Sequence, residues 1–82
     1  MTAKTPEQLV SVYGDMVYRL AYAQTRSRHD ADDIFQEVFL QTVLKRPVFD
    51  SVEHEKAWLL KVAANLSKNC IEYNRIRQTD EL

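Results

Sequence analysis

The sequence predicts an all-α fold, a compact bundle of three principal helices in one domain. The 82 residues include one glycine and two prolines, which leaves little turn chemistry for a sheet protein, whereas strong helix formers are plentiful. Three segments repeat their apolar residues at the helical period of about 3.6 residues. A chain of this length buries only about 60–65% of its unfolded surface. We therefore expect a single helical core over residues 6–77 of a domain that spans 1–82.

The first predicted helix begins at a capping box. Thr5 is the N-cap and Pro6 the first helical residue, and Gln8 follows where its side chain can reach back to the N–H of the cap. The apolar residues that follow at helical spacing are Leu9, Val12, Tyr13, Met16, Val17 and Leu20. Gly14 lies within this run and costs about 1 kcal/mol relative to alanine, a feature typical of a close contact with another helix.

The second predicted helix runs from Asp30 to about Arg46. Asp30 is expected to cap it, and Pro47 stops it. At 100° per residue, one arc is apolar and is expected to face the core; it holds Ile34, Phe35, Val38, Phe39 and Thr42. The opposite arc mixes acids, an amide and two leucines: Asp33, Gln36, Glu37, Leu40 and Leu44.

Leucines among carboxylates on the outer side of a helix favour a docking surface over a merely solvated one. The alternative is that Leu40 and Leu44 cover a neighbouring loop. The helix alone leaves both interpretations open.

The third predicted helix begins after a Ser51 cap and runs to about Arg77. Its first apolar stripe holds Leu59, Val62, Ala63, Leu66, Cys70 and Tyr73, and its second holds Ala57, Leu60, Ala64 and Ile71. A helix that is apolar over most of its circumference is expected to lie between other helices.

Only a narrow arc of this third helix is polar. It holds Lys61, Asn65, Lys68, Glu72 and Arg75, with Trp58 and Asn69 at its margin. Cations suit a phosphate backbone, amides suit base edges and an aromatic face suits base stacking. The strip therefore has the chemistry of a nucleic-acid contact, although this helix taken alone favours a solvated lysine face.

Charge is segregated along the chain although the net charge is only −1. Residues 30–37 hold four acids and no cation, whereas residues 55–78 hold Lys56, Lys61, Lys68, Arg75 and Arg77 against Glu55 and Glu72. This pattern indicates two partners of different sign.

Several classes of function are not expected. The single Cys70 cannot form an internal disulfide, and with His29 and His54 isolated, no group has metal-ligand spacing. No apolar run reaches membrane-spanning length and no signal peptide is visible, so a cytoplasmic protein without membrane insertion is expected. No nucleophile–base pair, catalytic carboxylate pair or phosphate-binding glycine loop is present, so the chain is predicted not to be an enzyme and to need no cofactor.

The order of motifs resembles region 2 of the bacterial sigma-70 family, extracytoplasmic-function (ECF) group. It consists of D-A-D-D-I-x-Q-E-V-F-L at 30–40, a loop with a phenylalanine, and A-W-L-L-K-V-A-A-N-L-S-K-N at 57–69. The resemblance covers about 7–77, and the motifs are specific through their order and spacing together.

This resemblance implies a transcription initiation factor domain. It implies that Asp33, Gln36, Glu37 and Leu40 bind the clamp helices of the largest catalytic subunit of core RNA polymerase. It also implies that the domain recognises and melts the promoter −10 element on the non-template strand, through Phe49, Trp58, Lys61, Asn65, Lys68, Asn69 and Arg75. Within that set, Phe49 is expected to hold a flipped base, with a core plug as its alternative. Trp58 either wedges the duplex or packs.

Two departures from the family pattern matter. The region that reads the −35 element is absent, so we expect a truncated domain or a fragment, and the arginine-rich end of region 2 is reduced to Arg75 and Arg77. An anti-sigma factor is a further expected partner. The main alternative is a sigma-like module that docks polymerase or an anti-sigma factor without reading DNA, and a generic helical bundle is a remote third.

Overall fold

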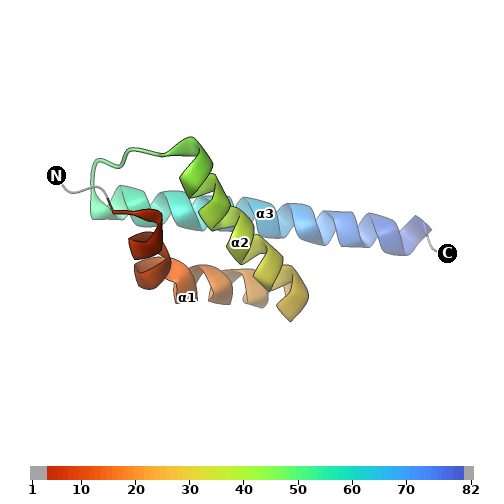
Figure 1. Ribbon diagram of the computed structural model, residues 1–82. Helices are drawn as coiled ribbons and strands as arrows, with labels where there is room; N and C mark the ends of the chain where they lie inside the picture. The colour runs from red at the N-terminus through yellow and green to blue at the C-terminus, as the bar shows by residue number, and fades with distance from the viewer. Residues whose placement is uncertain (1–3, 81–82) are drawn as a thin grey trace.

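The computed structural model describes residues 4–80, which form three α-helices and no strand. The helices are α1 (Pro6–Thr25), α2 (Arg28–Lys45) and α3 (Val52–Asp80). In Figure 1, α1 and α2 lie against the first part of α3, and the C-terminal part of α3 extends beyond both. The all-α fold of three helices is confirmed.

Local capping explains where the helices begin and end. Thr5 caps α1 with the full capping box: its hydroxyl accepts from the Gln8 N–H at 3.2 Å, and the Thr5 N–H donates to Gln8 Oε1 at 2.8 Å. The Ser51 hydroxyl accepts from the His54 N–H at 3.1 Å at the start of α3. Arg46 ends α2 in the left-handed conformation just before Pro47. These predicted boundaries are confirmed.

The predicted start of α2 is wrong. The helix begins at Arg28, and Ser27 is its N-cap, with its hydroxyl accepting from the Asp30 N–H at 3.2 Å. The Asp30 carboxylate instead accepts from the Asn74 side-chain amide of α3 at 3.1 Å. The Asp30 side chain is thus bonded to a residue 44 positions away in the chain and does not cap the helix.

All three helices contribute to the core. Its buried apolar residues are Leu9, Tyr13, Val17, Ala21, Ala31, Ile34, Val38, Phe39, Leu59 and Ala63. A Cβ built on Gly14 would lie 3.3 Å from Cε2 of Phe35, which confirms the close approach of α1 to α2 expected at this glycine. Val12, predicted in the core stripe of α1, is exposed because it lies about 100° round the helix from the buried Tyr13.

The prediction that α3 lies between other helices is wrong. Its second apolar stripe is uncovered, with Ala57 and Ile71 exposed and Leu60 half-buried. The described chain supplies only two further helices, and the buried apolar residues of α3, Leu59 and Ala63, lie on its other stripe. Helix α3 is therefore covered on one side only.

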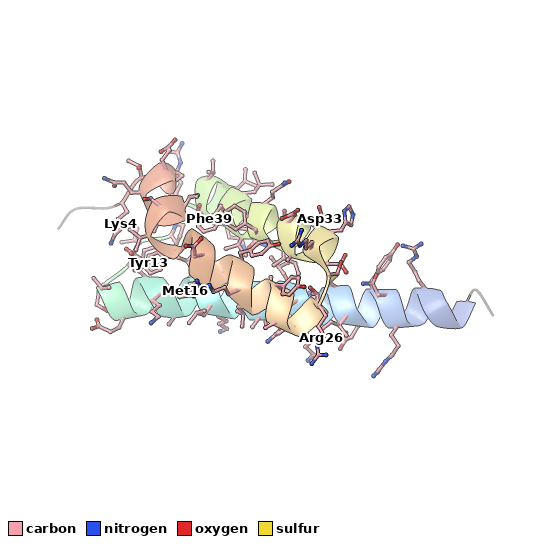
Figure 2. All side chains as sticks on the ribbon, turned by 90° about the horizontal axis from the view of Figure 1, so that it is seen from below. Lys4, Tyr13, Met16, Arg26, Asp33 and Phe39 are labelled. Atoms are coloured by element: carbon pink, nitrogen blue, oxygen red, sulfur yellow. The ribbon has the colours of Figure 1, made fainter. Side chains whose placement is uncertain are left out.

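A buried polar cluster joins the segment before α1 to the first turn of α3. Lys4 Nζ donates to Glu55 Oε1 at 2.8 Å, and the side chain of Tyr13 interacts with the same carboxylate. Glu55 and Tyr13 are both buried. Figure 2 shows Lys4 and Tyr13 at the same end of the molecule. Pairing in this way makes it possible to bury a carboxylate that would be costly to leave alone.

Candidate functional site

The outer side of α2 carries the first group of predicted site residues. Asp33, Gln36, Glu37 and Leu40 are all exposed, and we call them the α2 face. Leu40 is 49% exposed, and Leu44, one turn further on, is 71% exposed. Within residues 4–80 no loop covers these leucines, which argues against the interpretation that they cover a neighbouring loop. The structure thus brings the four residues together on one accessible surface.

A shallow apolar groove adjoins the α2 face. It lies between the start of α1 and the middle of α2, and is lined by Pro6, Glu7, Val10, Gln36, Phe39, Leu40 and Val43. Leu40 and Gln36 belong to both the groove and the face. The contribution of α1 was missed from the sequence, because Val10 lies outside the apolar stripe of its helix and carries no motif.

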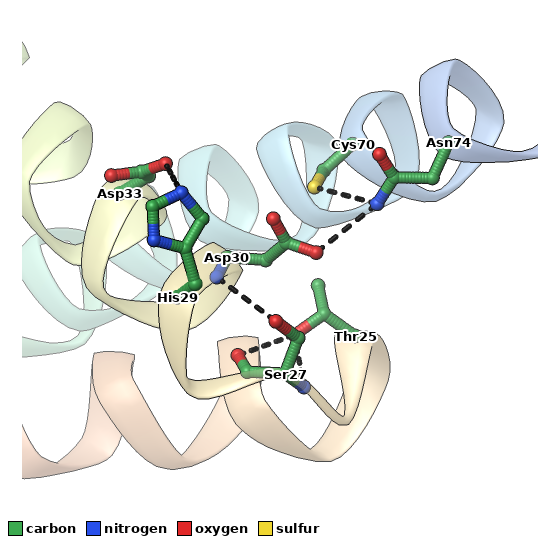
Figure 3. A network of polar contacts seen from close by, with 7 residues as sticks. All are labelled: Thr25, Ser27, His29, Asp30, Asp33, Cys70 and Asn74. Atoms are coloured by element: carbon green, nitrogen blue, oxygen red, sulfur yellow. Dashed lines mark hydrogen bonds and ion pairs between the residues drawn. The ribbon is translucent and has the colours of Figure 1, made fainter. Parts of the chain in front are cut away.

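Polar contacts tie the N-terminal turn of α2 to α3 (Figure 3). Besides its bond to Asp30, the Asn74 amide lies 3.8 Å from Cys70 Sγ. Burial, followed by the nearby Asp30 carboxylate, raises the pKa of the Cys70 thiol, and Asn74 opposes this only in part. Nearby on α2, His29 Nε2 lies 3.5 Å from Asp33 Oδ2. Of these contacts, the Asp30–Asn74 bond joins α2 to α3, whereas the others lie within a single helix.

The second group of predicted site residues lies along α3. Lys61, Asn65, Lys68, Asn69 and Arg75 are exposed, and we call them the α3 strip. At 1.5 Å per residue, the strip extends for about 21 Å. A strip of this length can contact several nucleotides. It lies on a different helix from the α2 face.

The remaining predicted residues, Phe49 and Trp58, are in contact with each other. Their ring centroids lie 5.8 Å apart at an interplanar angle of 63°, and Phe49 also meets the ring of His54 at 5.4 Å and 89°. Trp58 is half-buried and packs against the core, so its packing role is observed, whereas a role as a wedge stays a prediction.

Phe49 also lines a large cavity that the sequence did not predict. The cavity has a volume of about 910 Å³ and lies between the segment leading into α1, the end of α2 and the loop at 46–51. Its lining residues are Lys4, Pro6, Leu9, Thr42, Val43, Arg46, Pro47, Val48, Phe49, Asp50, Ser51, Val52 and Glu55. Phe49 therefore forms part of a cavity wall in addition to its aromatic contacts.

The aromatic contacts of Phe49 and the two amides of the α3 strip lie at different positions along α3. Trp58, the α3 neighbour of Phe49, lies about 10 Å along the helix axis from Asn65 and about 16 Å from Asn69. Phe49 and Asn69 are therefore too far apart to touch the same base.

Among residues 4–80, no three histidine, cysteine or acidic side chains gather closely enough to hold a metal ion. None of the helices described has the length and apolar character needed to cross a membrane.

Comparison with known proteins identifies the family. The family model for Sigma-70 region 2 matches residues 9–79. The ECF RNA polymerase sigma factor SigW of Bacillus subtilis is 34% identical over 59 residues, which cover 72% of this chain and 32% of SigW. The ECF RNA polymerase sigma factor SigE of Mycolicibacterium smegmatis is 37% identical over 65 residues, covering 73% of this chain and 23% of SigE. SigX of Bacillus subtilis is 25% identical over 76 residues, covering 93% of this chain and 38% of SigX.

These curated relatives are much longer than the part matched, since the chain spans between 23% and 38% of their lengths. No solved structure matches the chain. The family match covers most of the chain, over the same residues that form the α2 face and the α3 strip. The chain therefore belongs to the sigma-70 region 2 family, in its extracytoplasmic-function group.

Proposed function

We propose that this domain acts in transcription initiation by joining core RNA polymerase to the promoter −10 element. The α2 face binds the clamp helices of the largest catalytic subunit. The α3 strip, with Phe49, holds the non-template strand. An anti-sigma factor that covered either surface would block the corresponding contact.

The observation that carries this proposal is the exposure of Leu40 within the acidic motif. A leucine that the fold leaves half-exposed, with the carboxylates of Glu37 and Asp33 one and two turns before it on the same side of α2, offers an apolar anchor beside hydrogen-bond acceptors. Arginine side chains on a partner can pair with both carboxylates while the leucine is desolvated. This is the composition of a protein–protein hot spot for a basic helical partner.

Strand capture on the α3 strip needs no covalent chemistry. Separating a base from its neighbours costs a few kcal/mol, and a base held on the protein offsets that cost. Binding that favours the open form shifts the duplex toward opening. Exposed Asn65 and Asn69 offer donors and acceptors to base edges, and Lys61 and Lys68 offer cations to phosphates.

We expect the isolated domain to bind single-stranded −10 DNA better than duplex DNA, and to bind both weakly. The net charge is −1 and the strip supplies only a few phosphate contacts, so duplex affinity is expected near the usual non-specific range of about 10⁻⁴–10⁻⁶ M or weaker. Fluorescence anisotropy with both DNA forms at a stated salt concentration measures this difference.

Two exposed lysines of α3 provide the matched control. Lys68→Ala is expected to weaken single-strand binding, whereas Lys56→Ala, about 120° away round the helix, is expected to leave it unchanged. Tight duplex binding by the free domain would contradict the proposal. Failure to bind either DNA form, with the domain folded, would support the rival function of a protein-docking module without DNA readout.

A further inference from the structure

The loop at 46–51 has few contacts that could hold Phe49 in one orientation. Its neighbours face solvent: Val48 is 81% exposed and the side chain of Asp50 is 95% exposed. Phe49 itself is half-buried against α3. A loop aromatic that must receive a base gains affinity when its orientation is already set before binding, because less conformational freedom is then lost.

His54 makes two separate contacts with this loop. Its ring Nδ1 accepts a hydrogen bond from the backbone N–H of Asp50 at 3.2 Å. Its ring also meets the ring of Phe49 edge to face, with centroids 5.4 Å apart. One side chain thus restrains both the ring of Phe49 and the backbone of the next residue.

His54 is itself well placed to do this. It lies in the first turn of α3, where its N–H donates to the Ser51 hydroxyl at 3.1 Å. Trp58, one turn later on the same helix, contacts Phe49 from a second direction. The ring of Phe49 therefore contacts two rings of α3, those of His54 and Trp58.

The bond from Asp50 also determines the tautomer of His54. Because Nδ1 accepts, the proton of the neutral imidazole must be on Nε2, an assignment that follows from the hydrogen-bond geometry. The acceptor at the Nδ1 position is therefore the feature to preserve or remove in a variant. An asparagine side-chain oxygen can occupy nearly the same place, whereas a phenylalanine keeps a ring without an acceptor.

We propose that His54 is a positioning residue that presents Phe49 to the non-template strand, by accepting a hydrogen bond from the Asp50 N–H at the start of α3. This inference rests on the function proposed above. His54 is not among the residues that were predicted to bind DNA.

The test compares four variants for binding of a single-stranded −10 oligonucleotide by anisotropy. His54→Ala removes the ring and the acceptor, His54→Phe removes the acceptor alone and His54→Asn restores it. We expect His54→Ala and His54→Phe to bind about 3–10-fold more weakly, the effect of one lost hydrogen bond, and His54→Asn to remain within about 3-fold of the natural chain. Glu53→Ala, an exposed neighbour in the same helical turn, is expected to bind normally.

A second readout checks the position of the loop without DNA. Trp58 is the only tryptophan, so acrylamide quenching of its emission reports whether Phe49 still covers it. Quenching is expected to rise in His54→Ala and His54→Phe but not in His54→Asn, while circular dichroism stays unchanged. An asparagine variant as weak as the alanine variant, or an alanine variant that binds normally, would overturn the positioning role.

Phe49→Ala separates this inference from the function on which it rests. Normal binding by Phe49→Ala would overturn the role proposed for Phe49 in DNA binding, and the positioning role of His54 with it. Weak binding by Phe49→Ala together with normal binding by His54→Ala would overturn only the positioning role.

Discussion

Leu40→Ala combined with Glu37→Lys is expected to abolish binding of the domain to a clamp-helix fragment of RNA polymerase. Leu40→Ala removes the apolar anchor. Glu37→Lys replaces a hydrogen-bond acceptor with a positive charge, which repels the basic partner. Truncating one hot-spot residue costs about 2 kcal/mol or more, so the pair should weaken binding by at least about 100-fold. A pull-down against the immobilised fragment measures the loss.

The α3 helix offers a control with the same chemistry. Ile71→Ala combined with Glu72→Lys makes the same kind of changes at an exposed apolar–acidic pair outside the α2 face. Both double variants should keep the helical circular dichroism signal, because neither alters the core. Binding that survives in the folded Leu40/Glu37 variant would remove the docking proposal, and equal loss in both variants would assign the effect to net charge.

Glu55→Gln is expected to lower the free energy of unfolding by about 1–3 kcal/mol at neutral pH, the range for buried hydrogen bonds to a charged group. Burial by itself raises the pKa of the Glu55 carboxyl. The hydrogen bonds from Lys4 and Tyr13 and the charge of Lys4 outweigh burial, so that the pKa lies below its usual value. The folded protein therefore holds this proton less readily than the unfolded chain does.

The sign of the pH dependence follows from that difference. The contribution of Glu55 is fully present above the ordinary carboxyl range and is lost as the pH falls through the lowered folded pKa. At the other end, burial, then the hydrogen bond to Glu55 and then the nearby carboxylates raise the pKa of Tyr13 from 10.0 to about 12. The contribution of Tyr13 is present below pH 10 and is lost as the pH rises toward about 12.

Denaturant unfolding at a series of pH values, followed by circular dichroism, measures both effects. Glu55→Gln should flatten the acid side of the profile. Glu53→Gln, an exposed carboxylate two residues earlier, should keep the natural shape. A Glu55→Gln profile that runs parallel to the natural one would show that the buried cluster contributes nothing to acid sensitivity.

Local signals in the sequence predicted much of the fold. The start of α1, the start of α3 and the end of α2 were predicted correctly, because the residues that determine them act within one helical turn. These residues are Thr5 with Gln8, Ser51, and Arg46 with Pro47. The start of α2 could not be predicted in this way. Ser27 and Asp30 are both good caps, and spacing alone does not choose between them: Ser27 caps the helix, whereas the Asp30 side chain bonds to Asn74, far away in the chain.

For the candidate site, too, the sequence predicted features that depend on helical periodicity but not contacts between distant residues. Helical periodicity alone placed Leu40 and Leu44 on an exposed side of α2. The pairing of Lys4 with Glu55 joins residues 51 positions apart, and no periodic pattern carries information about it. His54 was dismissed as isolated because its contacts with Asp50 and Phe49 depend on how the loop folds back onto α3.

Readout of the −10 element by the α3 strip is the central claim, and base preference tests it most directly. In a chimera, residues 9–79 would replace the matching region of SigW from Bacillus subtilis, and the holoenzyme would transcribe a library of randomised −10 sequences. Asn65→Ala is expected to change which base is preferred at one position, by roughly 1–3 kcal/mol of discrimination. Lys68→Ala is expected to lower output from all sequences about equally and to flatten the salt dependence. If Asn65→Ala lowers only total output and leaves the base preference intact, the strip does not read sequence and the account is contradicted.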